Sequence, residues 1–213
     1  MHGNFLPLVI KHGLLRDATG LCVQGFSGAV LQLAAGNGYF GMVTAGTPTL
    51  AMGPDHFKLR CGMYFATSQA ISLSGGQGIV ISLQHYQALR QFGGPLEVHG
   101  RLRYIDGCTD TLLISPPRLG EPCLNHLHIP AHTNQTEHTH PSVRIGVIVS
   151  GSGECVTPER TYPLFAGMAW WIPAGTRHAF RTRDLALDVI AWHPDSDFGP
   201  TDEVHPMKNR TLL

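Results

Sequence analysis

Glycine and proline interrupt this chain at short intervals, and the apolar runs between them are too short for long helices. The 213 residues include 25 Gly and 15 Pro, and almost none of the chain keeps a 3.6-residue apolar period. Short apolar runs separated by turn-forming residues are typical of strands joined by tight turns. The sequence therefore predicts an all-β fold. As an exception, we predict a short helix over residues 84–91, ended by Gly93-Gly94-Pro95.

The Gly93-Gly94-Pro95 segment is also the expected boundary between two halves of the chain. We expect residues 1–95 to form one domain and residues 96–213 to form another. A weak internal repeat supports this division, because residues 57–65 align with residues 162–170 with a Gly-Met pair in register. Such a repeat suggests a duplicated barrel.

Composition narrows the classes of function. Hydrophobic residues make up 43% of the chain and charged residues 14%, which is typical of a globular protein. The 15 basic residues balance the 15 acidic ones, so there is no electrostatic reason to expect nucleic acid or a membrane surface as the partner. A small neutral or singly charged ligand fits better.

The N-terminal sequence lacks the pattern of a signal peptide, and no apolar run is long enough to span a membrane. We therefore expect a cytoplasmic protein. The five cysteines are odd in number, widely spread and without a CxxC pair, so we expect free thiols rather than a disulfide framework or a structural zinc site.

Three histidines have spacings that suit a single metal ion. His138 and His140 lie two residues apart, so their side chains share a face of the strand that we predict over residues 138–149, before a turn at residues 151–153. A Pro-x-Gly turn then delivers His178 from a different strand, which a barrel can bring opposite the first two. Imidazole nitrogens are common ligands of divalent metals.

The same alternation places Arg144 and Gly146 on the face of the histidines and four β-branched residues on the opposite face, namely Val143, Ile145, Val147 and Val149. Such a face is not a solvated surface. We expect either the other half of the chain or a second subunit to cover it, the latter in a symmetric homodimer.

The pattern resembles the cupin superfamily, whose first motif is Gly-x5-His-x-His-x3–4-Glu-x6-Gly and whose second is Gly-x5-Pro-x-Gly-x2-His-x3-Asn. The matching positions, all within residues 110–195, are His138, His140, Gly151, Gly167, Pro173, Gly175 and His178. The resemblance implies a cupin double-stranded β-helix, or jelly roll, and the weak repeat alone suggests a second barrel in the N-terminal half. The N-terminal barrel is expected to be degenerate, because it lacks both histidine motifs, and to serve as a packing partner or lid.

The chain departs from the cupin pattern at three positions. The leading glycine is missing, Thr182 replaces the closing asparagine, and Arg144 occupies the place of the glutamate. A guanidinium stays protonated and does not ligate metals. What remains is a neutral three-histidine site, similar to cysteine-dioxygenase-like, gentisate-dioxygenase-like and diketone-cleaving cupins, which implies Fe(II). The ligands alone suit Ni, Mn, Cu or Zn as well.

The charge of such a site indicates its substrate. Neutral ligands favour an anionic substrate that chelates the metal. Arg144 is expected either to grip a substrate carboxylate or to pair with an internal acid such as Asp188 or Glu137. His193, at the end of the strand predicted over residues 185–193, is a candidate acid or base.

Other histidines and acids are weaker candidates. His126 and His128 form a competing His-x-His pair, and a hydrogen bond to a ligand imidazole suits them better than ligation. A bulge would be needed to turn Glu137 toward the metal as a fourth ligand. We expect the tail over residues 194–213 to wrap the neighbouring half or another subunit.

Three functional hypotheses follow. The first is a metal-dependent cupin enzyme, a ferrous three-histidine dioxygenase that acts on a small carboxylate-bearing or chelating substrate. The second is a non-redox isomerase, lyase or hydrolase that uses the metal as a Lewis acid, because fold does not fix chemistry. The third is a small-molecule binding or sensing protein without catalysis.

Overall fold

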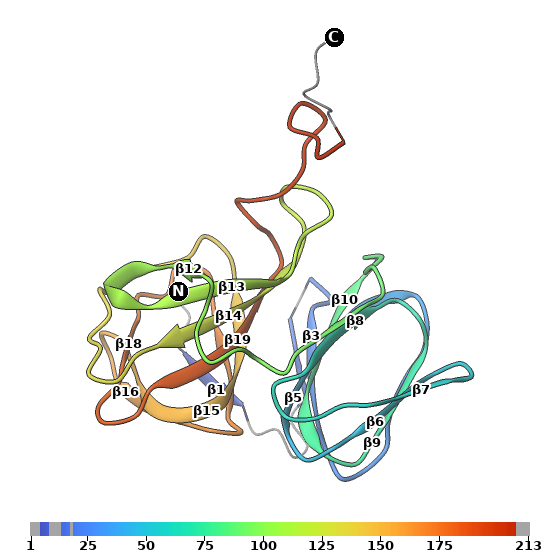
Figure 1. The fold of residues 1–213 in the computed structure, drawn as a ribbon, viewed down its shortest axis with the longest axis horizontal. Helices are drawn as coiled ribbons and strands as arrows, with labels where there is room; N and C mark the ends of the chain where they lie inside the picture. Colours follow the sequence, from blue (N-terminus) through green and yellow to red (C-terminus); the bar gives the residue numbers. More distant parts are fainter. Residues whose placement is uncertain (1–4, 9–13, 18, 208–213) are drawn as a thin grey trace.

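The computed structural model describes residues 5–8, 14–17 and 19–207 of the chain. In this part the regular structure consists of short strands and a single 3-10 turn at Ile105–Gly107, so the all-β prediction is confirmed. The strands form two barrels that lie side by side (Figure 1). No helix among the described residues is long and apolar enough to cross a membrane. All five cysteines carry free thiols, as predicted.

The N-terminal barrel consists of a six-stranded sheet that packs on a four-stranded sheet. The larger sheet has the order β11-β8-β5-β10-β3-β2 and the smaller the order β4-β9-β6-β7. Its strands are β2 (Leu14–Arg16), β3 (Cys22–Ser27), β4 (Leu31–Leu33), β5 (Asn37–Ala45), β6 (Thr49–Met52), β7 (Asp55–Lys58), β8 (Tyr64–Thr67), β9 (Ile71–Ser74), β10 (Gln77–Gln84) and β11 (Gln91–Gly93). Apolar side chains of both sheets fill the barrel.

The C-terminal barrel is built around a sheet with the order β1-β17-β15-β19-β14-β13-β12, and β16 and β18 pair with the far half of β15. Its strands are β1 (Leu6–Leu8), β12 (Leu102–Arg103), β13 (Thr109–Ile114), β14 (Cys123–Ile129), β15 (Arg144–Val156), β16 (Thr161–Phe165), β17 (Ala169–Ile172), β18 (Ala179–Arg181) and β19 (Leu187–His193).

The first strand of the chain lies in this second barrel. Leu6 in β1 pairs with Trp171 in β17, and Phe5 packs inside the barrel against Trp170. A division at residue 95 places β1 in the first domain, whereas strand pairing places it in the second barrel. Local sequence gives no sign of this pairing, because the partners are far apart in the chain.

Strand β15 continues through the segment for which the sequence predicts a turn. Its pairing with β19 shifts between Ile148 and Ser150, and Gly151 follows with φ +81°. A Cβ on Gly151 would lie 1.7 Å from the carbonyl oxygen of Ala186. The turn prediction at residues 151–153 is therefore wrong, because a β-bulge carries the strand from one sheet of the barrel to the other.

The Gly-Met repeat has the same geometry in both barrels. The N–H of Gly62 donates to the carbonyl of Val43, and the N–H of Val43 donates to the carbonyl of Met63, at 2.9 and 3.0 Å. Gly167, Ile148 and Met168 make the equivalent pair of bonds at 2.9 and 2.8 Å. The aligned segments therefore occupy equivalent places in two similar barrels.

The two barrels are also equivalent at a glycine that lies two residues before Val43 in β5 and two residues before Ile148 in β15. A Cβ on Gly41 would lie 2.0 Å from the ring of Phe65, and a Cβ on Gly146 would lie 2.3 Å from the ring of Trp170. Each glycine is the strand partner of the aromatic residue that covers it. At both positions an aromatic ring fills the space that a Cβ would need, so glycine fits where a larger residue would require the ring to move.

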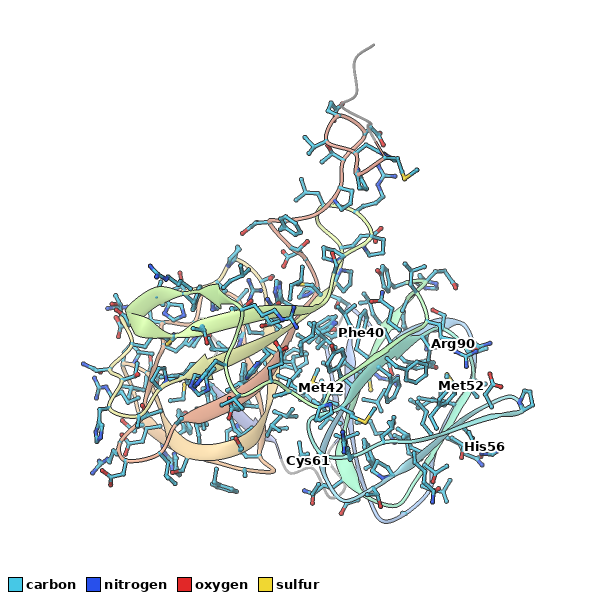
Figure 2. The ribbon with its side chains drawn as sticks, viewed as in Figure 1. Phe40, Met42, Met52, His56, Cys61 and Arg90 are labelled. Atoms are coloured by element: carbon cyan, nitrogen blue, oxygen red, sulfur yellow. The ribbon has the colours of Figure 1, made fainter. Side chains whose placement is uncertain are left out.

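The two barrels share an apolar core that buries the outer face of β15. Ile145 and Val147 are fully buried and pack in one cluster with Phe40 and Met42 of the N-terminal barrel. Phe40 and Trp192 lie 5.8 Å apart between ring centroids, and Figure 2 shows Phe40 and Met42 at the junction of the barrels. The sequence predicted that either the other half of the chain or a second subunit covers this face, and in the structure the other half of the chain covers it.

The helix predicted over residues 84–91 is absent. Strand β10 runs to Gln84, His85 turns with φ +58°, and an extended segment leads into β11. Tyr86 stacks on Phe40 at 6.1 Å, and the N–H of Ala88 donates to Oγ of Ser68 at 2.8 Å. These long-range contacts outweigh the local helical pattern.

The described part of the tail extends along a loop of its own barrel. The N–H of Leu119 donates to the carbonyl of Pro200 at 2.9 Å, and that of Gly120 donates to Ser196 at 3.0 Å. In Figure 1 this segment and the loop project together from the barrels. The predicted wrapping of the other half is therefore not seen in residues 194–207, and residues 208–213 lie outside the described part.

Candidate metal centre

The three predicted ligand histidines come together through backbone pairing at the mouth of the C-terminal barrel. His138 and His178 exchange two backbone hydrogen bonds of 3.0 Å each, and the N–H of Gly175 donates to the carbonyl of His140 at 2.8 Å. The predicted strand over residues 138–149 is wrong at its start, because β15 begins at Arg144. His138 instead forms an isolated bridge with His178.

The imidazoles are arranged to share one ion. One ring nitrogen from each of the three histidines lies within 4.8 Å of the others. Nδ1 of His138 lies 2.8 Å from the carbonyl oxygen of Thr136, and Nδ1 of His178 lies 2.9 Å from that of Thr176. Because a carbonyl only accepts, both rings carry a proton on Nδ1 and leave Nε2 as the donor to a metal. This donor set fits a divalent metal.

Burial keeps two of these histidines neutral. Desolvation, followed by the positive charge of Arg144, lowers the pKa of His140 to about 3. Desolvation is also the main cause that lowers the pKa of His178 to about 4, against the hydrogen bond to Thr176, which raises it. Neutral imidazole is the form that ligates metals, so His140 and His178 keep this form across the physiological pH range.

The histidines face a cavity of about 380 Å³ that also contains both predicted catalytic residues. Arg144, His193 and Trp170 line it. Six further polar residues that the sequence did not place in the site also line it: Arg103, Tyr104, Asp110, Asn125, Gln135 and Asp197. The inward position of Asn125 follows from strand alternation in β14, whereas Asp197 lies in the tail, where no local pattern indicates its position.

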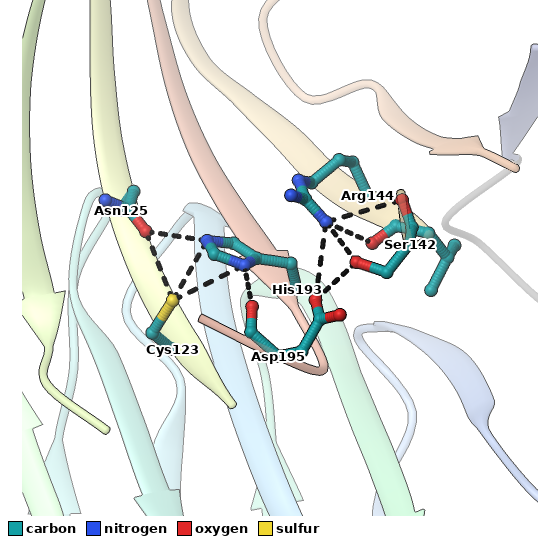
Figure 3. Close-up of polar contacts among 7 residues, drawn as sticks. Cys123, Asn125, Ser142, Arg144, His193 and Asp195 are labelled. Atoms are coloured by element: carbon teal, nitrogen blue, oxygen red, sulfur yellow. Dashed lines mark hydrogen bonds and ion pairs between the residues drawn. The ribbon is translucent and has the colours of Figure 1, made fainter. Parts of the chain in front are cut away.

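Arg144 is held by one edge of its guanidinium. Nη1 lies 3.3 Å from the carbonyl oxygen of Ser142, 3.2 Å from that of Val143 and 3.8 Å from Oδ1 of Asp195. Oγ of Ser142 also contacts Nη1 and donates to Asp195 (Figure 3). Among the described residues, every hydrogen bond of this side chain runs through Nη1. Nε and Nη2 therefore have donor capacity for a ligand.

The acids named as partners of Arg144 are engaged elsewhere. Asp188 accepts hydrogen bonds from His126 and His128, and Glu137 forms an ion pair with Arg177 at the surface. The acid that pairs with Arg144 is Asp195. Glu137 is not among the residues whose donor atoms cluster with those of the three histidines.

His193 lies on the cavity wall with partners at both ring nitrogens. Nδ1 contacts the carbonyl oxygen of Asp195, while Nε2 lies 3.2 Å from Oδ1 of Asn125 and 2.9 Å from Sγ of Cys123 (Figure 3). Burial, followed by the charge of Arg144, lowers the pKa of His193. The ring is thus fixed in orientation beside the guanidinium.

His126 and His128 lie on the other face of the barrel wall. Asn125 and Leu127 of the same strand line the cavity, so the alternation of β14 turns both histidines away from it. Their hydrogen bonds go to Asp188. The prediction that they bond to a ligand imidazole is therefore wrong.

The indole of Trp170 contributes an unsatisfied donor to this region. Trp170 lines the cavity and is only 2% exposed. Its Nε1 is buried and has no hydrogen-bond acceptor among the described residues. Buried indole N–H groups usually have an acceptor; Nε1 of Trp192, in the core shared by the barrels, likewise has none among the described residues.

Comparison with known proteins agrees with this geometry. The family model of the cupin domain matches residues 125–190, which contain all three ligand histidines. No curated protein matches the chain. The family match and the solved structures described next support the cupin superfamily.

Three solved structures illustrate the likeness in fold. A cupin 2 conserved barrel domain protein from Leptotrichia buccalis is 11% identical, with a TM-score of 0.60 over 92% of this chain and 91% of that one. Protein Ylba from E. coli is 18% identical, with a TM-score of 0.57 over 94% of each chain. A salicylate 1,2-dioxygenase mutant from Pseudoaminobacter salicylatoxidans in complex with gentisate is 9% identical, with a TM-score of 0.62 over 82% and 68%.

Proposed function

We propose that the C-terminal barrel is the active site of a ferrous dioxygenase that acts on a small carboxylate able to chelate the metal. The observation that carries the proposal is that three imidazoles and one arginine face the same cavity. A bound ferrous ion would supply Lewis acidity and the electrons for dioxygen chemistry. His138, His140 and His178 would hold it through nitrogen atoms alone.

The neutral ligand set determines which substrates suit the site. Three imidazoles add no negative charge, so a dipositive ion keeps its full charge in a partly buried cavity. An anionic, chelating substrate compensates this charge. The cavity volume of about 380 Å³ restricts the substrate to a small molecule.

Arg144 would orient that substrate. Its Nε and Nη2 atoms match the two oxygens of a carboxylate in a bidentate pair, while Ser142 and Asp195 hold Nη1. The carboxylate would then lie between the guanidinium and the histidines, with its second donor group directed toward the metal. Structural pairing with Asp195 uses Nη1, whereas the substrate would use Nε and Nη2, so Arg144 can serve both roles through different atoms.

His193 is our candidate for proton transfer. Nε2 is the nitrogen that would hold or release the proton, since Nδ1 contacts a backbone carbonyl. Exchange with a substrate requires Nε2 to leave Cys123 and Asn125. A variant that keeps metal binding but changes the pH profile of turnover would support this role.

One similar solved structure favours a particular set of test substrates. The similar solved dioxygenase is named for salicylate and was solved with gentisate, and both names denote hydroxy-aromatic carboxylates.

The runner-up function is non-redox Lewis-acid chemistry. A set of three imidazole ligands supports it equally, because such a set suits Zn and Ni as well as Fe.

Oxygen uptake tests the proposal. Protein reconstituted with Fe(II) without air should consume dioxygen when hydroxy-aromatic acids, thiols or diketones are added, and H178A should not. The exposed His56→Gln variant in the N-terminal barrel is the control. Tight binding of Zn or Ni, with no uptake across these substrates, would overturn the dioxygenase, and turnover without oxygen would favour the runner-up.

The N-terminal barrel completes the proposal as a second cupin without metal chemistry. Its strands repeat the hydrogen-bond pattern of the C-terminal barrel, but Tyr39 occupies the place that strand pairing gives to Arg144. Apolar side chains fill its interior. We propose a packing role for it. A homodimer in the cytoplasm remains a prediction, which size-exclusion chromatography with light scattering tests for the oligomeric state.

A further inference from the structure

A second group of possible ligands lies in the wall between the two barrels, on the face opposite to the three-histidine cavity. His126 and His128 project from β14, and Asp188 projects from the adjacent strand β19. His128 and Asp188 are direct partners across the antiparallel pair. Because these residues are separated from the three-histidine site by the strand alternation, the two groups are independent.

The imidazoles of His126 and His128 both contact the same carboxylate oxygen of Asp188. Oδ1 of Asp188 lies 3.0 Å from Nε2 of His126 and 2.8 Å from Nδ1 of His128. Oγ of Ser150 donates to Oδ2 of the same carboxylate at 2.5 Å. The three potential ligand atoms all lie within 4.8 Å of one another. Tetrahedral ligand atoms at about 2.0–2.2 Å from zinc lie about 3.3–3.6 Å apart, so both nitrogens need to move away from Oδ1 by only about half an ångström to hold one ion with it.

Burial and charge suit a cation. His126 is 1% exposed and His128 is 6% exposed, so water competes little for their nitrogens. Burial raises the pKa of Asp188, but hydrogen bonds from His126, Ser150 and His128 outweigh it and lower the pKa to about 2. The group therefore contains a full carboxylate charge enclosed by two imidazoles.

A cavity gives access to the group from solvent. It has a volume of about 650 Å³ and lies between the barrels, where Cys61 and Gly62 line one side and His128 and Asp188 the other. The connecting segment, including His99, forms a further wall. The ring of His99 meets that of His128 edge-on, with 4.7 Å between centroids.

We propose that His126, His128 and Asp188 form a second metal site, between the barrels, for a borderline divalent cation such as Zn²⁺. The ion would bind Nε2 of His126, Nδ1 of His128 and Oδ1 of Asp188, and each imidazole would then carry its proton on its other ring nitrogen. Ser150 would keep the carboxylate oriented from outside the ligand set. Water from the cavity or the exposed His99 would complete the coordination.

The competing explanation is a purely structural network, in which two imidazole N–H groups satisfy a buried carboxylate and tie β14 to β19. That network needs no ion and binds none. Metal stoichiometry separates the two explanations, and it also separates this site from the three-histidine centre.

The experiment measures zinc content by mass spectrometry and visible Co²⁺ absorption in tag-free full-length protein. Wild type should bind two ions per chain, D188N one and the triple variant H138A/H140A/H178A one. The combined variant should bind none. S150A should weaken the second ion about tenfold to a hundredfold, as removal of outer contacts to metal ligands generally does.

Several outcomes would overturn the second site. They are a wild type that binds a single ion which D188N still binds, a triple variant that binds none, or a D188N protein that binds as many ions as wild type. H85Q, which changes a histidine in the N-terminal barrel, is the matched control and should bind as wild type does. If the triple variant does not fold, as judged by near-ultraviolet circular dichroism, the comparison of wild type with D188N and H128Q decides alone. Loss of the three-histidine ion with retention of the second would disprove only the proposed dioxygenase.

Discussion

Asp195 links the two predicted catalytic residues: its carboxylate Oδ1 lies 3.8 Å from Nη1 of Arg144, and its backbone carbonyl contacts Nδ1 of His193. One residue of the tail thus fixes both the guanidinium and the imidazole at the rim of the cavity. We expect this contact, which the sequence did not indicate, to help orient Arg144.

Replacement of Arg144 should weaken binding of a carboxylate substrate more than it weakens metal binding. R144A removes a charge-assisted bidentate pair of about 1.5–3 kcal/mol, so KM should rise about tenfold to a hundredfold. R144K keeps the positive charge but lacks the planar guanidinium, so its KM should lie between those of wild type and R144A. Steady-state kinetics with metal content measured in parallel checks this. An unchanged KM in R144A would assign Arg144 to structural pairing.

Removal of Asp195 should have a smaller effect than removal of Arg144. D195A leaves the guanidinium in place but removes its 3.8 Å partner and the acceptor for Ser142. KM should therefore rise by a smaller factor than in R144A, and the double variant should be no worse than R144A alone. A double-mutant cycle on kcat/KM measures this. Additive losses would show that Asp195 does not act through Arg144.

The metal-free protein should lose stability in two steps as the pH falls. The folded-state pKa values of His140 and His178 lie near 3 and 4, below the ordinary value of 6.5. Their contribution is complete above pH 6.5 and is lost as the pH falls toward 4, with uptake of about two protons on unfolding. Asp188, with its pKa near 2 instead of 3.8, contributes above pH 3.8 and loses this contribution as the pH falls toward 2.

Urea unfolding in a chelator, from pH 7.5 to pH 2.5, measures these steps. H140N/H178N should flatten the upper step and leave the lower one, whereas D188N should do the opposite. Equal slopes in wild type and H140N/H178N between pH 6.5 and pH 4 would contradict the assignment.

Gly146→Ala should disturb the wall of the cavity. The added Cβ would lie 2.3 Å from the ring of Trp170, so the indole must move, at a cost of about 1–3 kcal/mol in the free energy of unfolding. W170L in the same chain removes the ring and should reduce the penalty of G146A. Chemical denaturation of the four variants forms the cycle. A penalty that is unchanged by W170L would show that another atom limits this position.

Trp192→Ala should destabilise the junction of the two barrels. The side chain is fully buried and packs against Phe40, so its loss should cost about 3–5 kcal/mol. The exposed Leu185→Ala variant is the control, with an expected change within about 0.5 kcal/mol. Urea unfolding measures both. A small effect of W192A would mean that the barrels do not depend on this shared core.

Local pattern was sufficient for much of the fold. The short spacing of glycine and proline predicted strands. The alternation along β15 correctly placed Ile145 and Val147 on one face and Arg144 and Gly146 on the other, because side-chain direction in a strand is a local property. The same reasoning failed for residues 84–91, where packing of Tyr86 on Phe40 outweighs the helical pattern.

The sequence by itself determined the chemistry that is available: three histidines, an arginine in place of a glutamate, and free thiols. Only the tertiary structure decided which groups meet. It placed β1 on the second barrel, Asp195 beside Arg144, and Asp188 with His126 and His128 instead of with the arginine. These contacts join residues far apart in the chain, and their partners are selected by the pairing of strands and the burial of charge, which no local spacing records.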